Sequence, residues 1–167
     1  MSIDELIKSG GTVLIEKFLD NSSEGFKTTF LQYVQTKFCD EGYREVGSVV
    51  TSSIGSALTE LPALVERYSH FKGFEINMLD NEEEQKSLLE LNKLISEDDY
   101  SICINNTSRR DGFKATIHDG TECIGHVEAE NVESALQKSV TFANILKTID
   151  TKASDYVSLA EDNCGVL

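Results

Sequence analysis

The chain has 167 residues, of which 40% are hydrophobic and 26% are charged, as in ordinary soluble globular proteins. It carries 29 Asp and Glu against 15 Lys and Arg, for a formal net charge of −14. One proline and only short apolar runs exclude a proline-rich chain and a transmembrane helix, which needs about 20 apolar residues. The first residues are acidic where a signal peptide is basic, and this predicts a cytoplasmic protein.

The first 96 residues are predicted to be mostly helical. Ser2 and Glu5 have the spacing of a capping box, which indicates a short helix that ends at the two glycines 10 and 11. A longer helix ending at Gly42 is predicted by apolar residues that recur every four positions. These residues are Phe26, Phe30, Val34 and Phe38.

Three further segments complete this half of the chain. Residues 46–55 are ambiguous, because their β-branched residues favour a strand while their small residues suit close helix packing. Pro62 suits the first turn of a helix that Gly73 closes. Acidic residues at 82–84 favour the positive end of another helix, with Leu88, Leu91 and Ile95 facing inward.

Residues 97–167 predict a three-stranded antiparallel sheet followed by a helix. Residues 100–104 alternate as a half-buried strand does, and segments 112–118 and 122–128 flank the turn signal Asp119-Gly120. Asn131 is expected to cap a helix, and after Asp150 we expect a short helix and a mobile end. The predicted fold class is therefore α+β, with a helical region 1–96 and a β-β-β-α region 97–167 that form two domains or one compact domain.

The register of the predicted hairpin follows from its apolar pattern. A loop of residues 119–121 places only apolar or small side chains on one face, whereas a two-residue turn would mix polar and apolar ones. The aligned residues would be Phe113, Ala115, Ile117, Cys123, Gly125, Val127 and Ala129. The other face would then bring His126 opposite Lys114.

Motifs for catalysis, cofactor binding and metal binding are missing from the sequence. The cysteines at 39, 103, 123 and 164 are too widely spaced for a zinc knuckle or a redox pair, so free thiols are expected. On the predicted hairpin His118 and His126 would lie roughly 13 Å apart, too far to share a metal. No phosphate-binding glycine loop or nucleophile elbow occurs. We expect no enzymatic activity, no cofactor and no metal.

Residues 100–149 resemble the HicB-type antitoxin module. The resemblance lies in the strand 100–104, the segment 111–115 that opens the second strand, and the acidic, Ala- and Leu-containing helix entry 129–136. This sequence lacks the proline-bearing segment that the family has between hairpin and helix. The same pattern is similar to small accessory domains of bacteriophages. Both resemblances imply a bacterial or phage protein that acts by binding, in the host cytoplasm if it is phage-encoded.

The leading hypothesis is a non-enzymatic regulator or inhibitor whose acidic surface binds a basic protein. The two-to-one excess of acids supports it, and also argues against binding to nucleic acid or to anionic membranes. In a stronger version the carboxylates imitate the phosphates of DNA. The predicted partner-binding residues are Glu82, Glu83, Glu84, Glu97, Asp98 and Asp99.

Two alternatives remain at this stage. The first is a protein that binds or sequesters a small anionic nucleotide through the most basic neighbourhood, which consists of Arg109, Arg110, Lys114 and His126. The second is a structural homo-oligomer in which the strand edge of residues 100–104 pairs across a two-fold axis.

Overall fold

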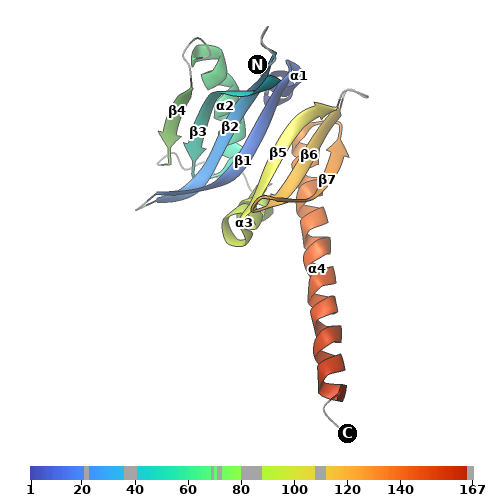
Figure 1. The fold of residues 1–167 in the computed structure, drawn as a ribbon. Coiled ribbons are helices and arrows are strands. Elements are labelled where there is room, and N and C mark those ends of the chain that lie inside the picture. Colours follow the sequence, from blue (N-terminus) through green and yellow to red (C-terminus); the bar gives the residue numbers. More distant parts are fainter. Residues whose placement is uncertain are drawn as a thin grey trace.

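The computed structural model describes residues 1–20, 23–35, 41–68, 70, 73–79, 88–107 and 112–164. The elements in chain order are α1 (Ile3–Lys8), β1 (Gly11–Asp20), β2 (Ser23–Gln35), β3 (Glu41–Thr51), α2 (Ile54–Tyr68), β4 (Phe74–Met78), α3 (Leu89–Asp98), β5 (Tyr100–Thr107), β6 (Gly112–Asp119), β7 (Glu122–Ala129) and α4 (Val132–Cys164). The strands form one seven-stranded mixed sheet in the order β4-β3-β2-β1-β5-β6-β7 (Figure 1). Among the strands of the described residues, only β3 and β4 pair in parallel.

The predictions of a mostly helical N-terminal half and of a three-stranded sheet are both wrong. Four of the seven strands lie there, and β1 pairs with β5, so strands from both sides of residue 96 share the sheet. The segment predicted as a long helix is strand β2, in which Phe26 and Phe30 are buried. A spacing of four fits both a helix and an alternating strand, and the intervening β-branched Thr28 and Thr29 favour the strand. Of the predicted helical stripe, Phe38 lies outside the described residues.

The rest of this half departs from the prediction at its boundaries. The ambiguous segment is strand β3 up to Thr51, and helix α2 starts soon after it, at Ile54. Pro62 therefore lies inside α2 and not in its first turn. The capping box is confirmed, since Ser2 and Glu5 each bond the other's backbone N–H. Helix α3 buries Leu91 and Ile95 as expected.

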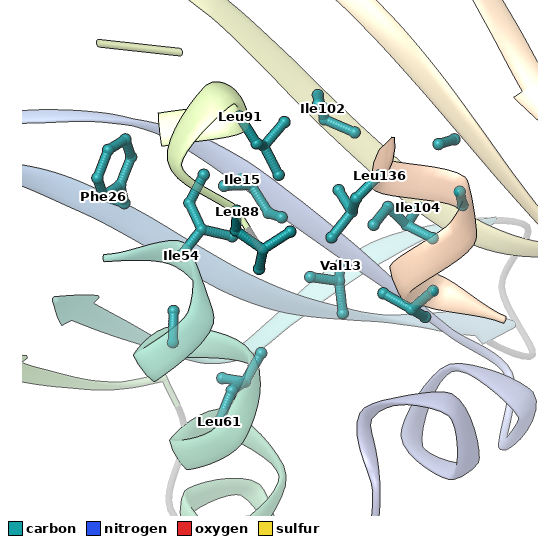
Figure 2. Packing of buried hydrophobic residues seen from close by; sticks show 14 of the residues in the cluster. Val13, Ile15, Phe26, Ile54, Leu61, Leu88, Leu91, Ile102, Ile104 and Leu136 are labelled. Carbon is teal, nitrogen blue, oxygen red and sulfur yellow. The ribbon is translucent and has the colours of Figure 1, made fainter. Parts of the chain in front are cut away.

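All four helices pack on one face of the sheet, and the core lies between them and the strands (Figure 1). Figure 2 shows the central part of this core, where side chains of the strands meet those of the helices. The labelled strand residues are Val13, Ile15, Phe26, Ile102 and Ile104. The labelled helix residues are Ile54, Leu61, Leu91 and Leu136, and Leu88 lies just before α3. Within the described residues, no helix covers the opposite face of the sheet.

The two halves of the fold have the same order of elements. Helix, three antiparallel strands and helix occur first as α1-β1-β2-β3-α2 and again as α3-β5-β6-β7-α4. The first strands of the two units, β1 and β5, pair antiparallel at the centre of the sheet, with Val13 opposite Ile104. Each half then adds its second and third strands outward. Helix α4 therefore corresponds in order to α2, but it has 33 residues against 15.

The predicted β-β-β-α order of the second half is confirmed, but the hairpin register differs in detail. Strands β6 and β7 turn at Gly120 and Thr121, and a bulge next to Ile117 shifts the pairing so that Ala115 lies opposite Val127. The predicted pairing of Ala115 with Gly125 is therefore two residues off. A shift of two preserves the faces of the strands, so the expected side of Phe113, Ala115 and Ile117 is still the core side.

Helix α4 begins as predicted and runs further than predicted. The Asn131 side chain accepts a 2.8 Å hydrogen bond from the backbone N–H of Ser134, and so caps the helix. The Asp4 carboxylate accepts a 3.2 Å hydrogen bond from the N–H of Val132 and ties α1 to this end. The helix continues to Cys164 and extends beyond the sheet (Figure 1). None of the helices in the described part of the chain has the length and hydrophobicity of a membrane span.

Candidate functional site

The acids predicted at 97–99 lie where helix α3 turns into strand β5, and they do not play equal parts. Asp98 accepts a hydrogen bond and ion pair from Lys147 of α4. Asp99 ends α3 in a left-handed conformation, with φ of 60°. Glu97 and Asp99 are exposed, whereas Asp98 is half-buried. The structure therefore assigns Asp98 to holding the fold and leaves Glu97 and Asp99 on the surface.

Two further acids that were not predicted as site residues join them at the same end of the sheet. Tyr100 opens strand β5 opposite Asp119 at the end of β6, and Asp119 lies opposite Glu122 at the start of β7. Asp119 and Glu122 are both exposed. Pairing between strands thus collects carboxylates that are about 20 residues apart in the sequence. We call Glu97, Asp99, Asp119 and Glu122 the acidic end.

A shallow cavity extends the acidic end toward the other half of the sheet. It has a volume of about 410 Å³. Glu24 of β2 and Asn92 and Glu97 of α3 are among the residues that line it. Lys17 pairs with Glu24 at 3.2 Å and also donates a 2.7 Å hydrogen bond to the backbone carbonyl of Ser96. These two contacts fix the ammonium group of Lys17 beside the cavity, between β2 and the end of α3.

Most of the described basic side chains make contacts within the molecule, although Lys8, Arg67 and Lys138 are exposed. Lys17, Lys27 and Lys147 form ion pairs, and Lys138 donates a 2.8 Å hydrogen bond to the backbone carbonyl of Glu128. Two more lie over aromatic rings, with Lys8 at 5.5 Å from the Phe113 centroid and Arg67 at 5.3 Å from that of Tyr68. Carboxylates dominate the charge that the protein offers to a partner, because acids outnumber bases by 29 to 15.

An ion pair with shifted pKa values lies away from the acidic end. Lys27 of β2 and Glu75 of β4 pair at 2.6 Å across strand β3, and Ser48 lies within 3.4 Å of the same carboxylate. The hydrogen bond from Lys27 holds the pKa of Glu75 below its usual range, and the bond to Glu75 raises the pKa of Lys27. This pair ties three neighbouring strands together, so we read it as structural.

The two described residues of the predicted anion site, Lys114 and His126, are not directly opposite each other. Lys114 lies opposite Glu128 on one side and Asn105 on the other, and His126 lies opposite Thr116. The predicted pairing of Lys114 with His126 is therefore wrong, and a carboxylate stands in the position expected for the histidine. Arg109 and Arg110 lie outside the described residues, as do Glu82, Glu83 and Glu84.

A larger cavity lies on the helical side of the molecule. It has a volume of about 570 Å³, and residues from α1, α2 and the start of α4 line it. Asp4 and Glu133 are its acidic residues, and Asp4 already accepts the N–H of Val132 at the start of α4. The lining has no Lys or Arg among its residues, so the cavity disfavours an anionic nucleotide.

Thiols and metal ligands offer no stronger candidate among the described residues. In that part of the chain no group of three or more His, Cys, Asp and Glu side chains is placed to hold a metal ion. Cys103 is half-buried in strand β5, and burial raises the pKa of its thiol, which is the opposite of activation. Cys123 is exposed on strand β7.

Comparison of the chain with protein-family models, with curated proteins and with solved structures found no match. The resemblance of residues 100–149 to the HicB-type module therefore stays a prediction. Strand β5, whose edge was expected to pair with a second copy, is hydrogen-bonded on both sides, to β1 and to β6. A two-fold contact through that edge is excluded by the fold.

Proposed function

We propose that the protein is a non-enzymatic regulator or inhibitor that binds a basic protein partner through its acidic end, and that it acts in the cytoplasm. One observation carries the proposal: strand pairing brings Asp119 and Glu122 to the end of the sheet where Glu97 and Asp99 lie at the end of helix α3, and all four are exposed. Opposite charges on two surfaces accelerate their encounter and make the binding sensitive to salt.

The distribution of cations supports the same proposal. Ion pairs, ring contacts and backbone hydrogen bonds engage Lys8, Lys17, Lys27, Arg67, Lys138 and Lys147. With 29 acids against 15 bases, a positively charged partner would meet an excess of carboxylates on this protein. A phosphate-bearing partner would meet mainly repulsion, which argues against nucleic acid as the ligand.

The proposal is tested by comparing two variants of equal charge. In the first, the acidic end is neutralised by Glu97→Gln, Asp99→Asn, Asp119→Asn and Glu122→Gln. The matched control neutralises four acids elsewhere, by Glu45→Gln, Glu60→Gln, Glu128→Gln and Glu130→Gln. Each purified full chain is immobilised, exposed to extract of the native cells, washed and eluted with salt, and the eluted proteins are identified.

We expect the wild-type chain and the control to retain the same basic protein, and the acidic-end variant to lose it. The partner is then purified, and its affinity for each chain is measured at low and high salt. A partner that both variants bind equally, or whose affinity does not change with salt, would show that the acidic end is not the binding site.

A further inference from the structure

Helix α4 has a part that packs on the sheet and a part that does not. Ala143 is fully buried, Leu146 is half-buried, and Lys147 bonds to Asp98 at the end of the body. Ile145 and Ile149, one turn apart, are 53% and 55% exposed. Figure 1 shows the helix continuing past α3 and away from the sheet. The apolar side chains Ile145 and Ile149 thus begin a stripe where the helix leaves the body.

The fold itself does not need this extension. Helix α2, which has the corresponding place in the first half, has 15 residues, and α4 has 33. Ile145 and Ile149 are four residues apart on this continuous helix, a spacing typical of a seam that packs against another helix.

Large apolar side chains that are exposed together, as Ile145 and Ile149 are, typically mark a contact surface. A partner that packs against the two isoleucines would remove their apolar surface from water, which is favourable.

Charge indicates which partner fits. Residues 150–164 contain Asp150, Asp155, Glu161 and Asp162 but a single cation, Lys152. A second copy would bring the same excess of acid against itself, and each chain carries a net charge of −14. A helix with an apolar seam and Lys or Arg beside it would complement both the stripe and its charge.

We propose, building on the proposed function, that the stripe begun by Ile145 and Ile149 is a docking surface for a basic amphipathic helix of the partner. Lys147, which lies between Ile145 and Ile149 in the chain, pairs with Asp98 between Glu97 and Asp99, so the stripe and the acidic end are adjacent. The stripe supplies the apolar contact, and the acidic end supplies attraction. The partner thus combines a basic surface with a helix whose apolar side is exposed.

The test uses the full chain and two synthetic peptides of about 21 residues, three heptads long, made of Leu and Lys. One peptide has Leu at the two seam positions of each heptad, and the other has the same composition in an order that forms no seam. The chains are the wild type, Ile149→Asp, Ile145→Asp, and Asn144→Asp as a control that adds the same charge at an exposed position on another side of the helix. Thermal unfolding is recorded for each chain.

We expect the wild type and Asn144→Asp to bind the seam peptide and to bind the scrambled one much more weakly. Ile149→Asp and Ile145→Asp should each weaken binding by about tenfold, the loss typical of removing an interface anchor, with an unchanged unfolding midpoint. Equal binding of both peptides, or equal binding by Asn144→Asp and Ile149→Asp, would overturn the docking surface.

Sedimentation equilibrium of the chain without peptide tests whether a second copy of the chain occupies the docking surface instead. A monomer is expected, and a dimer that Ile149→Asp dissociates would overturn the proposal in favour of a second copy. The acidic-end variant distinguishes this proposal from the proposed function. If a basic partner depends on the acidic end but not on Ile149, the docking surface fails and the proposed function stands; if the seam peptide binds while no basic partner is retained, the reverse holds.

Discussion

Lys147 of helix α4 donates a hydrogen bond to the carboxylate of Asp98, the last residue of helix α3. The same ammonium group lies 5.8 Å from the ring centroid of Tyr100, the first residue of strand β5. One cation thus joins the helix that leaves the body to the corner that carries the acidic end. The ion pair also neutralises the carboxylate of Asp98, which would otherwise add to the negative charge of the acidic end.

Replacing this cation should loosen the corner and raise its negative charge. In Lys147→Met we expect the free energy of unfolding to fall by no more than about 1 kcal/mol, because both partners are partly exposed. Association with a basic partner should become faster, since Asp98 is no longer paired. Urea unfolding and stopped-flow binding measure the two effects. The matched control is Lys93→Met on the exposed side of α3, and equal destabilisation by both changes would contradict the role of Lys147.

A buried hydroxyl without a partner should make one position of the core easy to improve. Thr28 of strand β2 is fully buried, and its Oγ1 has no hydrogen-bond partner. Thr28→Val keeps the shape and removes the desolvated hydroxyl, so we expect the free energy of unfolding to rise by about 1 kcal/mol. Thr51→Val is the control with the opposite sign, because Thr51 Oγ1 donates a 2.7 Å hydrogen bond to the carbonyl of Ser53. Urea unfolding in which both variants shift alike would refute this reading.

The ion pair between Lys27 and Glu75 predicts two pH limits for its contribution to stability. The lowered pKa of Glu75 means that its contribution is present above the ordinary value of about 4.3 and is lost as pH falls through the lowered pKa. The raised pKa of Lys27 means that its contribution is present below about 10.4 and is lost as pH rises through the raised pKa.

We therefore compare the wild type with Glu75→Gln by urea unfolding across pH. The difference in unfolding free energy should be below about 1 kcal/mol at neutral pH, because the pair is solvent-exposed, and should shrink at both extremes. A difference that stays constant into strong acid would mean that the carboxylate of Glu75 is not stabilised in its charged form.

The close packing of helix α4 on the sheet depends on Gly125 of strand β7. A Cβ added at Gly125 of strand β7 would lie 2.4 Å from the ring of Phe142 on α4, so the ring must move. We expect Gly125→Ala to destabilise the protein by about 1–3 kcal/mol, the usual cost of overpacking. Gly42→Ala is the control, because a Cβ there meets nothing within 4 Å. Thermal unfolding compares them, and the absence of a difference would show that Phe142 yields freely.

The sequence predicted the second half of the fold better than the first, for physical reasons. Strands β5 to β7 alternate clearly, and Asn131 caps the helix that follows. In the first half, Phe26 and Phe30 are four residues apart, a spacing that a helix and a strand share. The pairing of β2 with β1 and β3, which is long-range, decided between them.

The acidic end could be predicted only in part. Glu97 and Asp99 were found because they are adjacent in the sequence, whereas Asp119 and Glu122 join them only through the pairing of β5, β6 and β7. The expected strand order could have indicated this, because Asp119 and Glu122 flank the turn opposite the start of β5. Asp98 does not belong to the acidic end because it pairs with Lys147. That contact depends on how α4 packs against α3, and no local sequence pattern specifies it.

The most direct test of the account is the salt dependence of affinity for the basic partner, measured in parallel for the wild type, the acidic-end variant and the control of equal charge. The account predicts that affinity falls steeply with salt for the wild type and the control. The acidic-end variant should bind weakly and depend little on salt. Identical affinities and salt dependences for the two variants would show that net charge alone is recognised, and would contradict a binding site at the acidic end.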